Sequence, residues 1–145
     1  MNESTALMLA CVERYQSAMD RVAANLRPGD GILGFGNDPR RSPYHMDFYN
    51  ELGELVGRLA QGEWPAEEAG ETVEFLLTLG ETFGGKMTLS MMEAAQGHVL
   101  PLVPLLARDQ AEQLARSYAA RYPRRKRLPI QEKVLQALEK RAKGR

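Results

Sequence analysis

Cysteine and long apolar runs are scarce in this chain of 145 residues. The single cysteine, Cys11, cannot form an intramolecular disulfide, and this usage favours a reducing compartment. No apolar run approaches the ~18 residues that a membrane-spanning helix needs. The N-terminus also lacks a basic stretch that leads into an apolar one, which a secretory signal would show. We therefore expect a cytoplasmic protein with no membrane partner.

Histidine is almost as scarce, which argues against a metal centre. The chain has only His45 and His98, and Glu93 precedes His98 by five positions, whereas ligands on one helical face stand three or four apart. Two glycine-rich stretches, residues 29–34 (GDGILG) and 80–86 (GETFGGK), partly match phosphate-binding motifs. Neither follows a predicted strand, and Met87 stands where a P-loop needs Ser or Thr. We expect no metal, no cofactor and no enzymatic activity.

Strand patterns are missing as well, because no short segment alternates apolar and polar residues between turn signals. Apolar residues instead recur at helical spacing, and these repeats define the buried face of each predicted helix. The clearest sets are Met8, Val12, Tyr15, Met19, Val22 and Leu26; His45, Tyr49, Leu52, Val56 and Leu59; Val73, Leu76, Leu77 and Phe83; Leu114, Tyr118 and Tyr122; and Val134 with Leu138. The chain is predicted to be an all-α, single-domain bundle of five or six helices with antiparallel neighbours.

A long loop interrupts this pattern after the first predicted helix. Residues 27–42 hold four glycines and two prolines, which is a loop composition of unusual length for one domain. Two prolines, Pro101 and Pro104, also break the apolar stretch VLPLVPLL, so that we expect no regular helix there. Long loops of this kind often carry binding residues, and Asp38, Arg40 and Arg41 are the candidates here.

Net charge is close to zero overall but is strongly segregated along the chain. The whole sequence has 19 acidic and 19 basic residues. Residues 51–100 contain nine acidic and two basic side chains, a net charge of −7, whereas residues 101–145 contain four and twelve, a net charge of +8. Either the two regions serve different partners or they pack on each other, and the sequence leaves both possibilities open.

The densest acidic patch, which we call the acidic ridge, comprises Glu67, Glu68, Glu71 and Glu74. Like charges three or four residues apart on a helix repel each other mildly, so the ridge carries a small cost in stability. Such a ridge can be a solvated face. It can also face a basic partner, where complementary charge speeds association and rejects wrong partners. We predict that the ridge and the three loop residues form a protein-binding surface.

The basic C-terminal segment, residues 124–145, supports a second hypothesis. Its cations could contact nucleic-acid phosphates, although aromatic residues for stacking on bases are limited to Tyr118 and Tyr122 upstream. We rank a nucleic-acid-binding regulator second, since a peripheral, solvated tail explains the same residues. The cations concerned are Arg124, Arg125, Lys126, Arg127, Lys140, Arg141, Lys143 and Arg145.

A third hypothesis is a small enzyme centred on His45. This histidine follows the long loop, where Asp38, Arg40 and Tyr44 could line a pocket with it. Cys11 is a weaker candidate nucleophile, because it lies next to the apolar stripe of the first predicted helix and is expected to be buried. The enzyme hypothesis ranks last.

One segment carries a resemblance to a known class of proteins. Residues 34–39 (GFGNDP), followed by Pro43, His45, Phe48 and Tyr49, resemble the N-terminal part of small helical proteins that act as immunity factors for bacterial toxins. The resemblance covers about 16 residues, 34–49, and contains no catalytic signature. It implies a bacterial binding protein that neutralises or escorts a partner, plausibly a toxin with a basic surface. The identity of that partner and the oligomeric state stay open.

Overall fold

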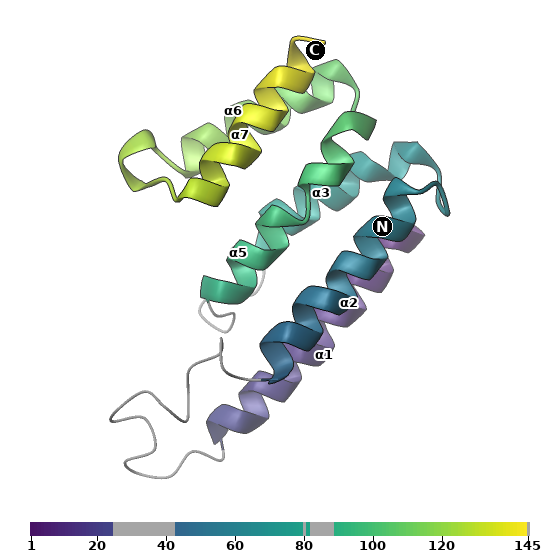
Figure 1. Cartoon of the computed structure of the whole chain (residues 1–145), viewed down its shortest axis with the longest axis vertical. Coiled ribbons are helices and arrows are strands. Elements are labelled where there is room, and N and C mark those ends of the chain that lie inside the picture. Colours follow the sequence, from purple (N-terminus) through teal and green to yellow (C-terminus); the bar gives the residue numbers. More distant parts are fainter. Residues whose placement is uncertain (25–42, 80, 82–88, 145) are drawn as a thin grey trace.

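The computed structural model describes residues 1–24, 43–79, 81 and 89–144, and these form α-helices, 3₁₀ segments and no strand (Figure 1). The predicted all-α, single-domain class is therefore confirmed. The predicted loop of residues 27–42 and Phe83 lie outside the described residues. The described elements are α1 (Glu3–Ala24), α2 (Pro43–Ala60), η2 (Ala66–Glu68), α3 (Ala69–Leu77), α5 (Leu89–Gly97), η4 (Leu100–Leu105), α6 (Arg108–Arg121), η5 (Arg124–Lys126) and α7 (Pro129–Ala142).

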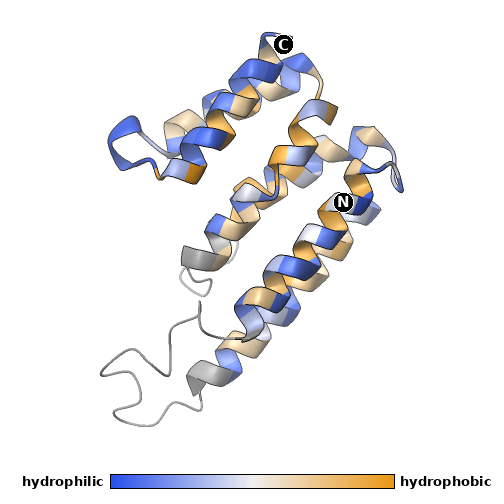
Figure 2. Cartoon of the chain, viewed as in Figure 1, coloured by the Kyte–Doolittle hydropathy of each residue, from blue (hydrophilic) through white to orange (hydrophobic). Residues whose placement is uncertain are grey.

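The helices stack in three layers (Figure 1). Helices α1 and α2 form an antiparallel pair on one side, and α6 and α7 form a second pair on the other. The shorter elements α3, α5 and η4 lie between the two pairs and contact both of them. In Figure 2 the apolar faces of the helices turn toward this middle layer, as burial of an amphipathic face requires.

The core draws apolar side chains from every α-helix and from η4. Most of the apolar positions predicted from helical spacing are buried, and Cys11 is fully buried among them, as expected. The side chains exposed by 1% or less include Met8, Cys11, Val12, Phe48, Leu52, Val56, Leu59, Val73, Leu76, Leu102, Leu106, Tyr118, Val134 and Leu138.

The buried face of α2 differs from the predicted one at its start. Phe48 is fully buried and meets the Tyr15 ring edge-on at 5.7 Å, whereas Tyr49 is 45% exposed. Because a helix turns by about 100° per residue, a core centred on Phe48, Leu52 and Val56 leaves Tyr49 at the edge of the buried face. The prediction that Tyr49 belongs to the core is wrong, and its ring is available to another surface.

The C-terminal segment is only partly peripheral. Helix α7 buries Val134, Leu135 and Leu138 against α6, α5 and η4, so residues 129–142 are part of the core. The Arg141 side chain also donates a hydrogen bond through Nε to the Leu106 carbonyl, at 2.7 Å. The solvated tail that the sequence suggested is thus confined, within the described residues, to the exposed turn η5 and the last residues.

The breaks between helices follow local chemistry. Gly62 ends α2 with a φ of 92°, a left-handed conformation that favours glycine. The two prolines, Pro101 and Pro104, leave a six-residue 3₁₀ segment, η4, in place of a regular helix, as predicted. Helix α6 starts at Arg108 with Ala107 at the cap position, and Asp109 lies in its first turn.

Within the part of the chain that the structure describes, no helix combines the length and apolar character needed to cross a membrane.

Candidate functional site

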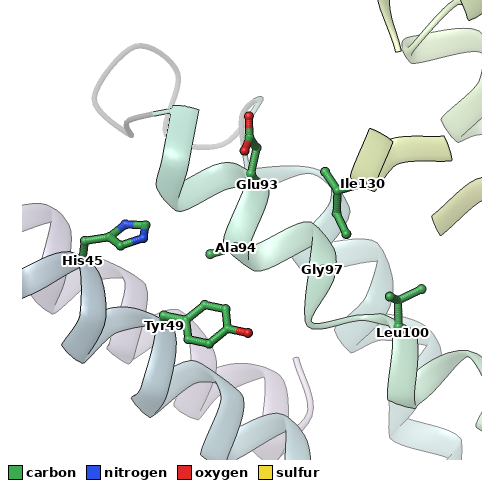
Figure 3. A pocket seen from close by; sticks show the side chains of 7 residues that line it. All are labelled: His45, Tyr49, Glu93, Ala94, Gly97, Leu100 and Ile130. Atoms are coloured by element: carbon green, nitrogen blue, oxygen red, sulfur yellow. The ribbon is translucent and has the colours of Figure 1, made fainter. Parts of the chain in front are cut away.

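A groove opens between the start of α2 and the elements α5, η4 and α7 (Figure 3). It has a volume of about 460 Å³, which lies within the range of small-ligand sites. Four elements far apart in sequence contribute its walls. The lining residues are His45, Tyr49, Glu93, Ala94, Gly97, Leu100 and Ile130. We call this surface the α2–α5 groove.

The polar groups of the groove are few and lack partners. Glu93 on α5 is half-buried, and no described residue forms a hydrogen bond or ion pair with its carboxylate. Across the groove, Nδ1 of His45 is buried and has no hydrogen-bond partner among the described residues. Ala94, Gly97, Leu100 and Ile130 are apolar, so the lining that the structure describes is largely hydrophobic and includes one carboxylate.

The position of Tyr49 in the groove is held by His98. Nε2 of His98 lies 2.9 Å from the Tyr49 carbonyl oxygen, and the two rings are 4.5 Å apart at their centroids. A carbonyl oxygen only accepts hydrogen bonds, so Nε2 carries the proton and donates it. Burial lowers the pKa of His98, which favours the neutral imidazole, although the bond to Tyr49 opposes this shift.

Exposed hydrophobic side chains concentrate beside the groove. Among the described residues, the large hydrophobic side chains that are exposed are Met1, Leu7, Tyr44, Met46 and Tyr49. Met46 and Tyr49 are 54% and 45% exposed and stand three positions apart, so they are neighbours on one side of α2, whereas Tyr44 points to another side of the helix. Tyrosine and methionine are residue types enriched at protein interfaces.

The acidic ridge, by contrast, is partly engaged within the molecule. Oε1 of Glu68 accepts hydrogen bonds from the Ser4 amide at 3.1 Å and the Ser4 hydroxyl at 2.7 Å. Oε2 of Glu71 accepts one from the Asn2 amide at 2.7 Å. The amides at the start of a helix have no partner within the helix and attract negative charge. Two of the four ridge residues therefore cap α1.

The other two ridge residues are exposed. The carboxylates of Glu67 and Glu74 make no hydrogen bond or ion pair with any described residue. The ridge lies near the N-terminus of α1 and the end of α2, whereas Pro43, which follows the predicted loop, begins α2 at its other end. The 18 residues of α2 separate these ends by about 27 Å. Asp38, Arg40 and Arg41 lie outside the described residues.

The basic C-terminal cations divide into two groups. Arg127 donates to Glu132 at 2.9 Å and to the Tyr122 carbonyl at 3.1 Å, and therefore has a structural role. Arg124, Arg125 and Lys126 are exposed in η5, and no described residue pairs with them.

The acidic middle and the basic C-terminal region hardly neutralise each other. Among the described residues, one ion pair joins them, between Arg121 and Glu81 at 2.7 Å. The charge segregation in the sequence is therefore largely retained as separate surfaces of the fold.

Of the four residues that the enzyme hypothesis brings together, the structure describes two, His45 and Tyr44. His45 lines the α2–α5 groove as proposed, but Tyr44 does not line it, and Asp38 and Arg40 lie outside the described residues. Burial raises the pKa of the Cys11 thiol to about 11, so the thiolate nucleophile is scarce at neutral pH. The described residues contain no group of three His, Cys, Asp or Glu side chains that could hold a metal ion.

Sequence reasoning missed most of the groove. Helical spacing predicts that Tyr49 belongs to the core, and no pattern in the sequence links Glu93 on α5 to the start of α2. Nothing in the sequence indicates that Ile130 faces α5. One sequence signal for the exposed side chains is the run of large apolar residues around Met46. These residues are too many to fit on the one buried face of α2, so some of them must be exposed.

Comparison of the chain with protein-family models, curated proteins and solved structures finds no match.

Proposed function

We propose that this protein is a cytoplasmic protein-binding module that neutralises or escorts a partner protein through the α2–α5 groove and the hydrophobic side chains beside it. The observation that carries the proposal is the pair of exposed neighbours Met46 and Tyr49 on one side of α2, with Tyr49 also lining the groove. Exposed apolar side chains next to a groove are typical of a protein interface.

The content of the groove supports binding over catalysis. Its described lining contributes one imidazole and one carboxylate, and no hydrogen bond connects His45 with Glu93. Nucleophilic catalysis usually requires a nucleophile within hydrogen-bond reach of a base that a third group orients. The described lining residues include no serine, cysteine, threonine or lysine. The chemistry available is recognition of an apolar surface with a polar group at its edge.

The resemblance to toxin-immunity proteins agrees with this location. Of the residues that carry the resemblance, His45 and Tyr49 line the groove, and Phe48 anchors the same turn of α2 in the core. The acidic ridge was the interface that the charge pattern suggested. Since Glu68 and Glu71 cap α1, we place the main contact surface at the groove and leave Glu67 and Glu74 as a secondary acidic contact.

A site-specific photo-crosslinker tests the proposal. The crosslinker replaces Met46, which is 54% exposed beside the groove, and in a control protein it replaces Gln113, which is exposed on α6. In cells of the source organism, we expect a discrete adduct with one protein from position 46 only. That protein is then purified, and its activity should fall to background when an equimolar amount of this chain is added.

Equal crosslinking from both positions, or a partner whose activity and stability do not change, would contradict the proposal. A second control uses Met46→Asp and Gln113→Asp. The aspartate at position 46 introduces a charge next to Tyr49 and should abolish the complex, while the same change on α6 should leave it intact.

Nucleic-acid binding is the second candidate, supported by the exposed cations of η5, with which no described residue forms an ion pair. Because three cations form a small patch, we expect duplex DNA to bind only in the micromolar range, with a steep salt dependence typical of nonspecific contacts. Nanomolar, sequence-selective binding that Arg124→Gln, Arg125→Gln and Lys126→Gln together remove would reverse the order of the two candidates.

A further inference from the structure

The α2–α5 groove has a chemical polarity that constrains its occupant. Its floor and one end are apolar, formed by Ala94, Gly97 and Leu100 with the ring of Tyr49 (Figure 3). Its other end carries the Glu93 carboxylate beside Ile130 (Figure 3). Because Glu93 is half-buried and no described residue pairs with it, the groove offers one unsatisfied negative charge next to an apolar surface.

From this arrangement we infer that the groove recognises a partner segment in which an apolar side chain is followed closely by an arginine, the apolar side chain packing against Tyr49 and Leu100 and the guanidinium pairing with Glu93. The inference rests on the proposed function and names the chemistry of the partner. Arginine fits better than lysine, since a guanidinium forms two parallel hydrogen bonds with a carboxylate and is less strongly hydrated.

The apolar end is rigid enough to select its ligand. His98 supports the Tyr49 ring and bonds to its carbonyl, so the ring is fixed before a partner arrives. Gly97 has no side chain to fill the groove. A methyl group at this position would lie 3.4 Å from Cδ1 of Ile130 and would narrow the space between α5 and α7. Preformed walls reduce the entropy that binding costs.

Charge around the groove is consistent with a basic occupant. None of the lining residues that the structure describes is basic, and residues 51–100, which include Glu93, carry a net charge of −7. The cations of η5 act in the opposite sense. This segment ends four residues before Ile130, and its positive charge would favour a carboxylate on the bound partner. These two possibilities predict opposite charge preferences, so one set of probes separates them.

The probes are three tripeptides with blocked ends: acetyl-Leu-Gly-Arg-amide, its citrulline analogue and its glutamate analogue. In an extended chain, residues two apart lie on the same face, so leucine and arginine can enter the groove together. Citrulline retains the shape of arginine but lacks its charge. Binding is followed on the full-length protein by amide chemical shifts in two-dimensional NMR.

We expect millimolar binding of the arginine peptide, with shifts confined to residues of the groove. The citrulline peptide should bind about two- to fivefold more weakly, as expected for one partly exposed ion pair, and the glutamate peptide more weakly still. Glu93→Gln should make the arginine and citrulline peptides equal. The matched control, Glu13→Gln, removes an exposed carboxylate of α1, outside the groove, and should preserve the difference.

Three outcomes would overturn the inference: equal binding of arginine and citrulline peptides to the wild type, tighter binding of the glutamate peptide, or no binding of any peptide. Tighter glutamate binding would assign the groove to an acidic segment that reaches η5. If the peptides fail but the Met46 crosslink and partner inhibition hold, this inference fails alone. If the arginine peptide binds as expected but no partner is neutralised or escorted, the proposed function fails alone.

Discussion

Gly53 and His98 touch so closely that a methyl group on Gly53 would lie 2.8 Å from Cε1 of His98. This contact joins α2 to α5 one turn away from the groove. The imidazole therefore packs on the Gly53 backbone while it hydrogen-bonds to Tyr49, and both contacts set the distance between the two helices. A glycine in a helix costs stability, and here the cost is offset by close packing.

Gly53→Ala should destabilise the protein because the added methyl group must displace His98. We expect a loss of about 1–3 kcal/mol in the free energy of unfolding, measured by urea denaturation. Gly57→Ala, in the same helix, is the matched control, since a methyl group at that position meets no described atom within 4 Å apart from the neighbouring backbone of α2. It should gain about 0.5–1 kcal/mol from helix propensity. A gain in both variants would show that His98 does not constrain the helix pair.

The stability of the protein should fall as the pH drops below about 6.5, the ordinary pKa of histidine. Burial lowers the pKa of His98 in the folded state, so the unfolded chain binds a proton more readily over this range. The contribution of neutral His98 to the free energy of unfolding is thus complete above pH 6.5 and is lost as the pH falls toward the folded-state pKa of this residue. His98→Gln retains a donor for the Tyr49 carbonyl but does not titrate.

Urea denaturation at pH 7.5 and 5.5 provides the measurement for both proteins. The loss of stability between the two pH values should be smaller in His98→Gln than in the wild type. An identical loss would assign the pH dependence to other groups.

Glu68→Gln should lower the melting temperature, although the charge pattern alone suggests relief of repulsion. The Glu68 carboxylate bonds to the amide and hydroxyl of Ser4 at the start of α1, so its charge stabilises that helix end. We expect a cost of about 0.5–2 kcal/mol, as for the loss of a helix cap. Glu67→Gln, an exposed neighbour, should stay within about 0.5 kcal/mol of the wild type. Calorimetry on both variants checks the difference, and equal melting temperatures would contradict it.

Leu138→Ala tests whether the C-terminal helix belongs to the core. The Leu138 side chain is fully buried, so its truncation should cost about 2–5 kcal/mol, measured by urea denaturation. Replacing Arg124, Arg125 and Lys126 in η5 with glutamine should change stability little, because these side chains are exposed and unpaired within the described residues. A cost below about 1 kcal/mol for Leu138→Ala would instead indicate a loosely attached tail.

The sequence alone determined the all-α class, the approximate extent of the helices and most of the core. These properties depend on local rules: helical spacing of apolar residues, the glycine at position 62 and the prolines of η4 act over a few residues. For the same reason the face of α2 was predicted well at Leu52, Val56 and Leu59. At the start of the helix, where Phe48 and Tyr49 are both aromatic, spacing could not show which one α1 would cover.

Only the tertiary structure decided which charged groups are free to bind a partner. Glu68 bonds to Ser4 across 64 positions of the chain, and Glu71 bonds to Asn2 across 69, so no local pattern shows that half of the acidic ridge caps α1. The α2–α5 groove likewise combines His45, Glu93 and Ile130 from three helices. Such juxtapositions depend on how helices pack, and packing depends on the shapes of all facing side chains together.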